Sequence, residues 1–252
     1  MSERTGRPLP ADVAGLQTLT TAQRHELARH WAERAASELR VGHSFEVIAA
    51  ALTELGAPTP LQALARRAVT DEHRHHQLSL DVASHYAGMP LAPPAELPFA
   101  PPIHRGVDER RKHQLWVLGQ CALNETFASA VLEASLARCD CAVADVALRT
   151  LLGDEVDHAR LGWAFASSLA PVERAEISGR LLSLVRANRK VWRETPRSEP
   201  TADALLGHGA LSAELIDQAV LVAIRDLVIP GFDQAGFEVA PIARWLRAGA
   251  PT

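Results

Sequence analysis

Two segments of the sequence carry the same order of acidic and histidine residues. Residues 71–75 and residues 154–158 both follow the pattern Asp-Glu-x-x-His. In an α-helix, residues three apart lie on one face and about 4.5 Å apart along the axis, so the Glu and the His of each segment can reach one pair of metal ions. A single Glu-x-x-His is expected about once by chance in a chain of this composition, whereas two copies that also carry the preceding Asp are not. The ligands predicted from these segments are Glu72, His75, Glu155 and His158.

A site for two metal ions in a helical bundle requires one further carboxylate from each neighbouring helix. If each segment lies on the second helix of an antiparallel hairpin, the partner carboxylate must lie about 30 residues upstream. Glu38 lies 34 residues before the Glu of the first segment, and Glu125 lies 30 residues before the Glu of the second. The competing residues, Glu46 and Glu133, each lie eight residues further along the chain, which is roughly 12 Å from the required level. We therefore predict that Glu38 and Glu125 are the remaining ligands.

The chemistry of this ligand set favours particular metals. Four carboxylates in the core of a bundle would each cost several kcal/mol if their charge were left uncompensated, and two divalent ions would cancel that charge. Carboxylate and imidazole ligands suit iron or manganese better than metals that prefer thiolates. The predicted cofactor is therefore two iron ions, with manganese or a mixed manganese–iron pair as the alternatives.

Other residues near the motifs have ordinary structural interpretations. Cys139 and Cys141 flank a predicted turn, and two thiols without further partners are a weak signal for metal binding. Cys121 and Ser129 each lie one turn from Glu125, where a packing residue is the ordinary interpretation and a wall of a substrate pocket or oxygen site is the alternative. Three more side chains are expected at the surface: His73, His76 and Asp157.

The elements that must position these ligands are predicted to be helices. Ala, Leu, Arg and Glu dominate the sequence and strand-like clusters are nearly absent. The pattern predicts four long helices, at about 21–55, 59–86, 108–138 and 142–169, and further helices at 171–192, at 212–228 and after Pro241. Thr20 or Thr21 is expected to cap the first helix, and Thr59 to cap the second with Pro60 at its first position. Two connections are predicted, an ordered crossing at 90–102 and a link at 195–201.

Length and composition limit the functional class. The chain of 252 residues is predicted to form a single domain, with a bundle at about 21–170 and a helical extension at 171–252. The net charge of −4, without clustered Lys and Arg, argues against a nucleic-acid partner. No apolar run is long enough to span a bilayer and no apolar leader is evident, so we expect no membrane partner and a cytoplasmic location. Three cysteines in a chain of this size do not indicate a disulfide framework.

The complete ligand set resembles that of the ferritin-like di-iron carboxylate superfamily, which includes ferritins, rubrerythrins, the small subunit of ribonucleotide reductase and bacterial multicomponent mono-oxygenases. Residues 45–58 leading into Asp71, and residues 154–159, also resemble bacterial ferritin-like domain proteins of unassigned role. The resemblance covers about residues 25–170. It implies an all-α, ferritin-like four-helix bundle with one long crossover, followed here by additional C-terminal helices. It also implies that Asp71 accepts a hydrogen bond from His158, and that Asp154 accepts one from His75.

Departures from these families narrow the expected activity. Ribonucleotide reductase needs a radical tyrosine where this chain has Ser79. Rubrerythrins usually add a four-cysteine iron module, whereas this chain has three cysteines. Ferritins usually end soon after the bundle, whereas this chain continues for about 80 residues. We therefore expect a non-haem di-iron oxidoreductase that activates dioxygen to oxidise or oxygenate a small organic substrate, with help from an electron donor. The alternative is an iron-handling ferroxidase or storage protein without an organic substrate. A helical interaction domain with a vestigial site is less favoured, because all six ligands are present. The C-terminal extension is expected to cover a pocket or to build a homodimer.

Overall fold

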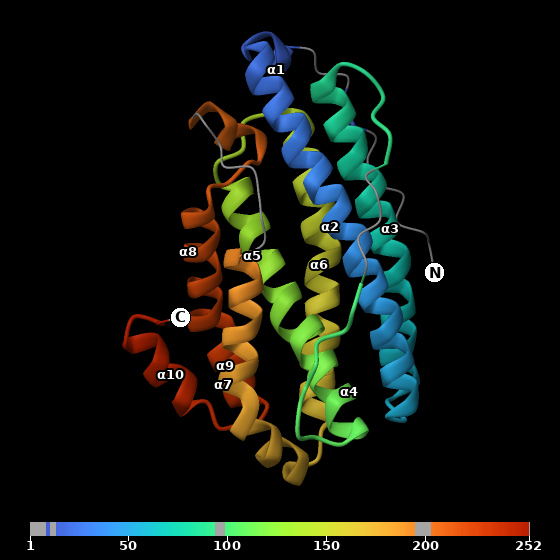
Figure 1. The fold of residues 1–252 in the computed structure, drawn as a ribbon, viewed down its shortest axis with the longest axis vertical. Coiled ribbons are helices and arrows are strands. Elements are labelled where there is room, and N and C mark those ends of the chain that lie inside the picture. The colour runs from blue at the N-terminus through green and yellow to red at the C-terminus, as the bar shows by residue number, and fades with distance from the viewer. Residues whose placement is uncertain (1–8, 11–13, 94–98, 195–202, 252) are drawn as a thin grey trace.

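Four long helical segments pack side by side to form the body of the structure (Figure 1). The computed structural model describes residues 9–10, 14–93, 99–194 and 203–251, and these residues contain helices and no strand. The four segments are α2 (Thr21–Glu54), α3 (Thr59–Ala87), the continuous run of α4 (Glu109–Val117), η1 (Leu118–Asn124) and α5 (Glu125–Leu136), and α6 (Ala142–Ser168). Within the bundle, α2 packs along α3, α6 packs along η1 and α5, and α3 also contacts α6. The predicted all-α bundle is confirmed.

The ends of the long helices follow from local hydrogen bonding. Thr20 caps α2 as predicted, since its side chain accepts a hydrogen bond from the Gln23 amide and the Gln23 side chain accepts one from the Thr20 amide. The predicted cap of the second helix is wrong: Thr59 is already helical and Pro58 is the cap residue, without a side-chain hydrogen bond. The reason is that the Pro58 carbonyl accepts hydrogen bonds from the amides of Leu61 and Gln62, which starts the helix one residue earlier.

The sequence predicts one helix for the third segment, but the structure shows that this helix is not a regular α-helix throughout. Its central part, η1, is a π-helix, in which the backbone makes wider turns. The backbone of η1 lies very close to Gly162 of α6. A Cβ atom added to Gly162 would lie only 2.2 Å from the Ala122 amide nitrogen. The two helices therefore meet backbone to backbone at this point.

Residues after α3 cross from one end of the bundle to the other before α4 begins (Figure 1). Residues 90–93 and 99–102 of the predicted crossing have no helical structure, and its residues 94–98 lie outside the described part of the chain. The predicted link at 195–201 also lies outside it.

A helical extension covers the side of the bundle formed by the third segment. It consists of α7 (Pro171–Glu194), the 3-10 turn η2 (Asp203–His208), α8 (Ala213–Ala223), η3 (Ile224–Val228), α9 (Ile229–Gln234) and α10 (Ala240–Arg247). Helix α7 packs against η1 and α4, and α8 packs against α5. The sequence did not predict η2 or the N-terminal α1 (Ala14–Gln17), since elements this short show no hydrophobic period. None of the described helices combines the length and apolarity needed to cross a membrane.

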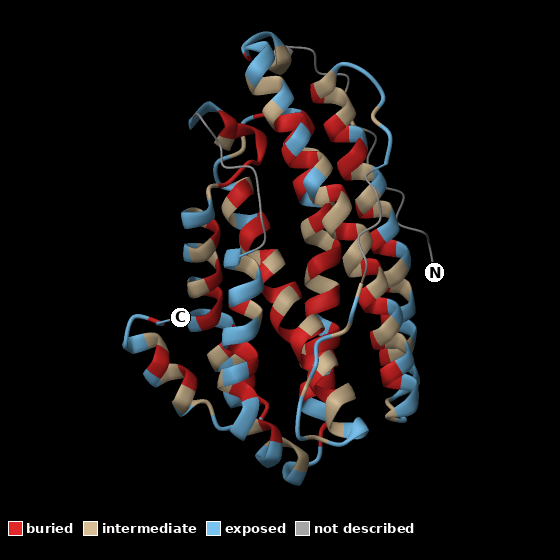
Figure 2. Ribbon diagram, viewed as in Figure 1, coloured by how far each residue is buried: buried red, intermediate tan, exposed pale blue. Residues whose placement is uncertain are grey.

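The interior contains two apolar clusters separated along the helices by a polar layer. One cluster includes Phe45 and Leu161, and the other includes Trp31 and Leu151. Figure 2 shows buried residues recurring along the length of the long helices, between partly buried and exposed ones. Glu38 lies on α2 between Trp31 and Phe45, so its level along the bundle is the polar layer. Apolar packing on both sides therefore holds this layer away from solvent.

Candidate metal centre

All six predicted ligand side chains lie together in the polar layer, and all six are buried. Their ligand atoms form two groups, and within each group these atoms lie within 4.8 Å of one another. The first group is Glu38, Glu72, His75 and Glu155, and the second is Glu72, Glu125, Glu155 and His158. Glu72 and Glu155 belong to both groups, so two adjacent ions could share these carboxylates. The buried cluster can hold a metal ion, while the identity and number of ions stay predictions.

The competing glutamates lie outside this cluster. The Glu46 side chain is 58% exposed and contacts His43 on the surface of α2. Glu133 is also exposed, near the end of α5. The hairpin spacing therefore selected, in both cases, the glutamate that the structure places in the core.

Three buried atoms in the cluster make no hydrogen bond of good geometry to the described residues, although other cluster atoms lie 3.1–3.5 Å away. They are both carboxylate oxygens of Glu72 and the Nδ1 atom of His75. A buried polar group without a partner costs about 1–3 kcal/mol, so a folded protein rarely leaves three such atoms at one place unless another group satisfies them. Metal ions would satisfy these atoms, and the carboxylate and imidazole donors match iron or manganese.

Burial makes two of the carboxylates difficult to ionise without a metal. Desolvation, followed by the charge of Glu72, raises the pKa of Glu38 from its ordinary 4.5 to about 7. Desolvation and the charge of Glu155 raise the pKa of Glu125 well above 4.5. Protons or metal ions must therefore compensate these groups at neutral pH.

In the metal-free cluster, the two histidines and the carboxylates stabilise each other's charged forms. Burial disfavours ionisation of Glu155, yet hydrogen bonds with His158 and His75 hold its pKa well below 4.5. Burial also disfavours the charged imidazoles, but the pKa values of His75 and His158 are raised well above 6.5 by the acidic residues around them. Binding of metal ions would have to displace these protons, because an imidazole ligand must be neutral.

Each imidazole presents one nitrogen to the cluster and the other to an aspartate on the opposite helix. The Nε2 atom of His75 lies 3.1 Å from Oδ2 of Asp154, and Nε2 of His158 lies 3.5 Å from Oδ2 of Asp71. The Nδ1 atoms instead lie 3.1–3.5 Å from the oxygens of Glu72 and Glu155. These are the contacts that the resemblance implies, and they leave Nδ1 facing the cluster, where it could bind a metal ion.

Two arginines of α3, which the sequence analysis missed, hold this pair of aspartates. Arg74 donates to Oδ1 of Asp71 at 2.9 Å and also to Oδ2 of Asp154. The Nε atom of Arg67 lies 3.2 Å from Oδ2 of Asp71. Both arginines lie three or four residues from Asp71, and this helical spacing is a signal that could have identified them. Although burial opposes it, interactions with the histidines and arginines lower the pKa of both Asp71 and Asp154.

Of the three neighbouring residues predicted at the surface, only one is exposed, and Asp157 and His76 are both partly buried. His73 is exposed, and the Asp157 side chain, 29% exposed, pairs with Arg67 and Arg160. His76 is partly buried, because its Nδ1 atom lies 2.8 Å from the carbonyl oxygen of Ala35 on α2.

Glu125 is positioned by the π-helix that precedes it. Its amide donates to the carbonyl of Gln120, five residues earlier, and the side-chain amide of Gln120 donates to its carboxylate. Ser44 of α2 donates to the side-chain oxygen Oε1 of Gln120 at 3.0 Å, and the side-chain amide of Asn124 donates to the same Oε1 atom at 3.4 Å. Trp192 of α7 donates to Asn124 at 3.1 Å, so the extension contacts this network. The sequence analysis did not identify these four residues.

Residues beside the cluster leave little room for a substrate. Cys121 is fully buried, and the hydroxyls of Ser79 and Ser129 are buried without a hydrogen-bond partner among the described residues. A hollow between α3 and α6 reaches His158 and Asp71, but its volume of about 10 Å³ suits only one water molecule.

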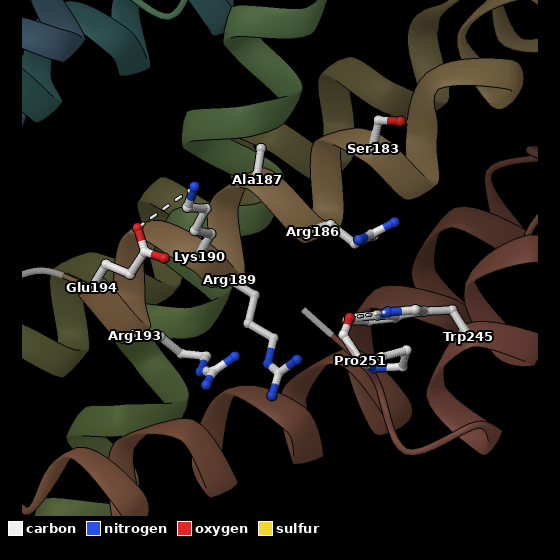
Figure 3. A pocket seen from close by; sticks show the side chains of 9 residues that line it. All are labelled: Ser183, Arg186, Ala187, Arg189, Lys190, Arg193, Glu194, Trp245 and Pro251. Carbon is white, nitrogen blue, oxygen red and sulfur yellow. Dashed lines mark hydrogen bonds and ion pairs between the residues drawn. The ribbon is translucent and has the colours of Figure 1, made fainter.

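A larger hollow of about 420 Å³ lies between α7 and the C-terminal end of the chain (Figure 3). Its wall includes Arg186, Lys190 and Trp245, and it contains none of the six cluster residues. This larger hollow is therefore separate from the cluster.

No protein-family model matches this sequence, and no curated protein matches it either. What the chain shows by itself is an all-α bundle whose buried glutamates and histidines can hold metal.

Proposed function

We propose that the cluster is a two-metal carboxylate centre of the ferritin-like type, with iron as its metal. The observation that carries the proposal is the pair of ligand groups that share Glu72 and Glu155. Glu38 and His75 would complete one position, and Glu125 and His158 would complete the other. Two divalent ions would cancel the four carboxylate charges and satisfy the unpartnered buried atoms.

We propose further that the protein is a non-haem di-iron oxidoreductase that uses dioxygen to oxidise a small organic substrate. A reduced iron pair supplies the electrons and the open positions for dioxygen chemistry. The protein's own residues keep the ligands oriented: Asp71 and Asp154 fix the imidazoles, and Arg74 fixes the aspartates. The apolar clusters on both sides exclude water. Repeated turnover requires an external electron donor.

The extension supports the enzyme over an iron store. Helices α7 and α8 cover the bundle on the side of η1 and α5, and this added layer would crowd a closed shell of many chains. Ser129, one turn from Glu125, has a buried hydroxyl without a hydrogen bond to the described residues, and we propose that this hydroxyl borders the oxygen site.

The alternative, an iron-handling ferroxidase without an organic substrate, is favoured by one observation. The hollow that reaches the cluster is large enough for only one water, and the larger hollow lies elsewhere. An enzyme would therefore have to open a path between the helices, whereas iron and dioxygen need only a narrow one.

Iron titration combined with a measurement of molecular mass tests the proposal. We expect a small oligomer that binds two ions per chain and, when the ferrous protein meets oxygen, consumes a limited amount of oxygen while retaining its iron. Continued oxidation of excess ferrous iron, with a mineral accumulating in a shell of many chains, would contradict the enzyme and support the store. Failure to bind iron or manganese at all would contradict both.

A further inference from the structure

A second group of reactive side chains lies at the turn between α5 and α6, outside the metal cluster. Cys141 is the N-cap residue of α6 and is 7% exposed, and Cys139, two residues earlier, is more accessible. The turn is anchored to η2, because the amides of Asp140 and Cys141 both donate to the Gly207 carbonyl, at 3.0 and 3.2 Å. A Cβ atom on Gly207 would lie 2.3 Å from the Asp140 carboxylate, so the two segments touch directly.

The Cys141 thiol faces a buried phenol and a buried imidazole. The Tyr86 hydroxyl of α3 lies 3.5 Å from Sγ of Cys141 and 2.9 Å from Nδ1 of His208. Tyr86 and His208 are 2% and 6% exposed. Trp31 of α2 donates to the backbone carbonyl of His208 at 3.2 Å, which fixes the backbone of this histidine. Two elements besides α6, namely α3 and η2, therefore hold polar side chains around this one sulfur atom.

These surroundings distinguish Cys141 from the other two cysteines. Burial disfavours its thiolate, but hydrogen bonds from His208, Tyr86 and the Ala144 amide at the start of α6 lower its pKa from 9.0 to about 7. Burial, with the charges of Cys141, Asp145 and Asp140 nearby, raises the pKa of Cys139 to about 11.

Two other ionisable groups do not compete with Cys141 for this role. Burial raises the pKa of Tyr86, so its phenol stays protonated and can donate. Burial, followed by the charge of Glu125, raises the pKa of Cys121.

A metal site is a poor explanation for this group. Among the described residues, the His, Cys, Asp and Glu side chains close enough to share an ion are those of the polar layer, and Cys139, Cys141 and His208 are not among them. The arrangement instead matches a nucleophilic thiol beside an imidazole, with a second thiol close in sequence.

We propose that Cys141 is a thiolate nucleophile that reduces hydroperoxides and that Cys139 is its resolving partner. The Cys141 sulfur attacks one peroxide oxygen, the O–O bond breaks, and the leaving oxygen takes a proton from water, while the Tyr86 phenol stays protonated beside the sulfur. Cys141 becomes a sulfenic acid, and the product is water or an alcohol. The Cys139 sulfur then attacks the Cys141 sulfur, and the hydroxyl leaves as water with the Cys139 proton. Two thiols thus supply the two electrons that reduce one hydroperoxide.

The pH dependence of alkylation by iodoacetamide tests the nucleophile on the full-length protein. A thiol with a midpoint near pH 7 is about half ionised there, against about 3% for an unperturbed cysteine. A thiolate of lower pKa is also less nucleophilic, so the larger ionised fraction gives a rate advantage of only about threefold at pH 7. The pH midpoint of alkylation is therefore a better readout than the rate. Peptide mapping should give a midpoint near pH 7 for Cys141 in the Cys139→Ser variant, and one above about pH 9 for Cys139 in the Cys141→Ser variant.

Variants of the two supporting residues make this test specific. His208→Gln should raise the Cys141 midpoint by about one pH unit or more, and Tyr86→Phe should raise it by less. Circular dichroism checks that each variant is folded, and Tyr86→Phe keeps the test usable if His208→Gln is not. A Cys141 midpoint at or above about pH 8.5, or one that both variants leave unchanged, would overturn the assignment.

Oxidation by hydrogen peroxide tests the resolving step. One equivalent should produce an intramolecular disulfide in the peptide that contains Cys139 and Cys141, whereas Cys139→Ser should leave a sulfenic acid on Cys141 that dimedone traps. Cys141→Ser should leave Cys139 reduced. Oxidation of Cys139 in that variant at the wild-type rate, a disulfide only between chains, or no oxidation of either thiol would each refute the proposed pair.

Discussion

Replacing Glu38 with glutamine should affect the metal-free and the metal-loaded protein in opposite directions. The Glu38 carboxylate is 7% exposed and lies among other acidic side chains, so without metal its ionised form is disfavoured. Glutamine has nearly the same shape but cannot ionise. We therefore expect Glu38→Gln to stabilise the metal-free protein at alkaline pH while it weakens metal binding.

The expected magnitude follows from the pKa of Glu38, which is raised from 4.5 to about 7. A carboxyl group whose pKa is raised on folding contributes its stability below pH 4.5, and this stability is lost as the pH rises through about 7. At ~1.4 kcal/mol per pH unit, the wild-type protein should lose about 3 kcal/mol relative to the variant. The variant's advantage should grow from about 1 kcal/mol at pH 5 to about 3 kcal/mol at pH 8.

Urea denaturation of chelator-treated protein at several pH values measures this difference. Glu46→Gln is the matched control, since that residue lies eight positions away on the same helix with its side chain 58% exposed. The control should change the free energy of unfolding by less than about 0.5 kcal/mol at every pH. A difference between Glu38→Gln and wild type that does not vary with pH would refute the reasoning, because a lost packing contact has no reason to titrate.

Three further predictions concern the rest of the centre. Glu125→Gln should abolish the second step of a metal titration and retain the first, because the Glu125 carboxylate lies only in the second ligand group. The control is Glu133→Gln, since Glu133 is exposed, and binding of two ions in one unchanged step by Glu125→Gln would contradict the prediction. Asp71→Ala and Asp154→Ala should fold but bind metal about 10- to 100-fold more weakly in a competition assay with a chelator. Unchanged affinity in both would show that these aspartates do not orient the ligands. Gly162→Ala should lower stability by about 1–3 kcal/mol in thermal unfolding, since its Cβ would strike the backbone of η1, and an unchanged melting temperature would refute that contact.

The positions of the six cluster residues could be predicted because α-helices convert sequence distance into axial distance. The three-residue spacing within each Asp-Glu-x-x-His places Glu and His on one face, and the antiparallel hairpins bring Glu38 and Glu125 to the same level. Neither step depends on details of packing. The prediction holds for Glu125 even after a π-helix, because the irregular turns come before this residue.

The parts that the sequence analysis missed depend on contacts between distant segments. The π-helix meets Gly162, which lies 40 residues from Ala122, and no local pattern reports such an approach. Gln120 acts on Glu125 only because the wider turns place residues five apart in contact, whereas a regular helix would bring together residues three or four apart. Arg74 was open to prediction from its spacing, but a charged residue on a helix is usually a solvated one.

The two halves of the centre share a motif but differ in how the protein supports them. Glu38 has a cation nearby, since Arg34 lies 3.6 Å away and favours its ionised form. Glu125 has a neutral amide donor instead, from Gln120, and its pKa is raised by burial and by Glu155. Ionising Glu125 therefore depends more strongly on a metal ion, so the first ion should occupy the position of Glu38 and His75. The second position then requires the ordered π-helix, which links its occupancy to Asn124, Trp192 and the extension that packs there.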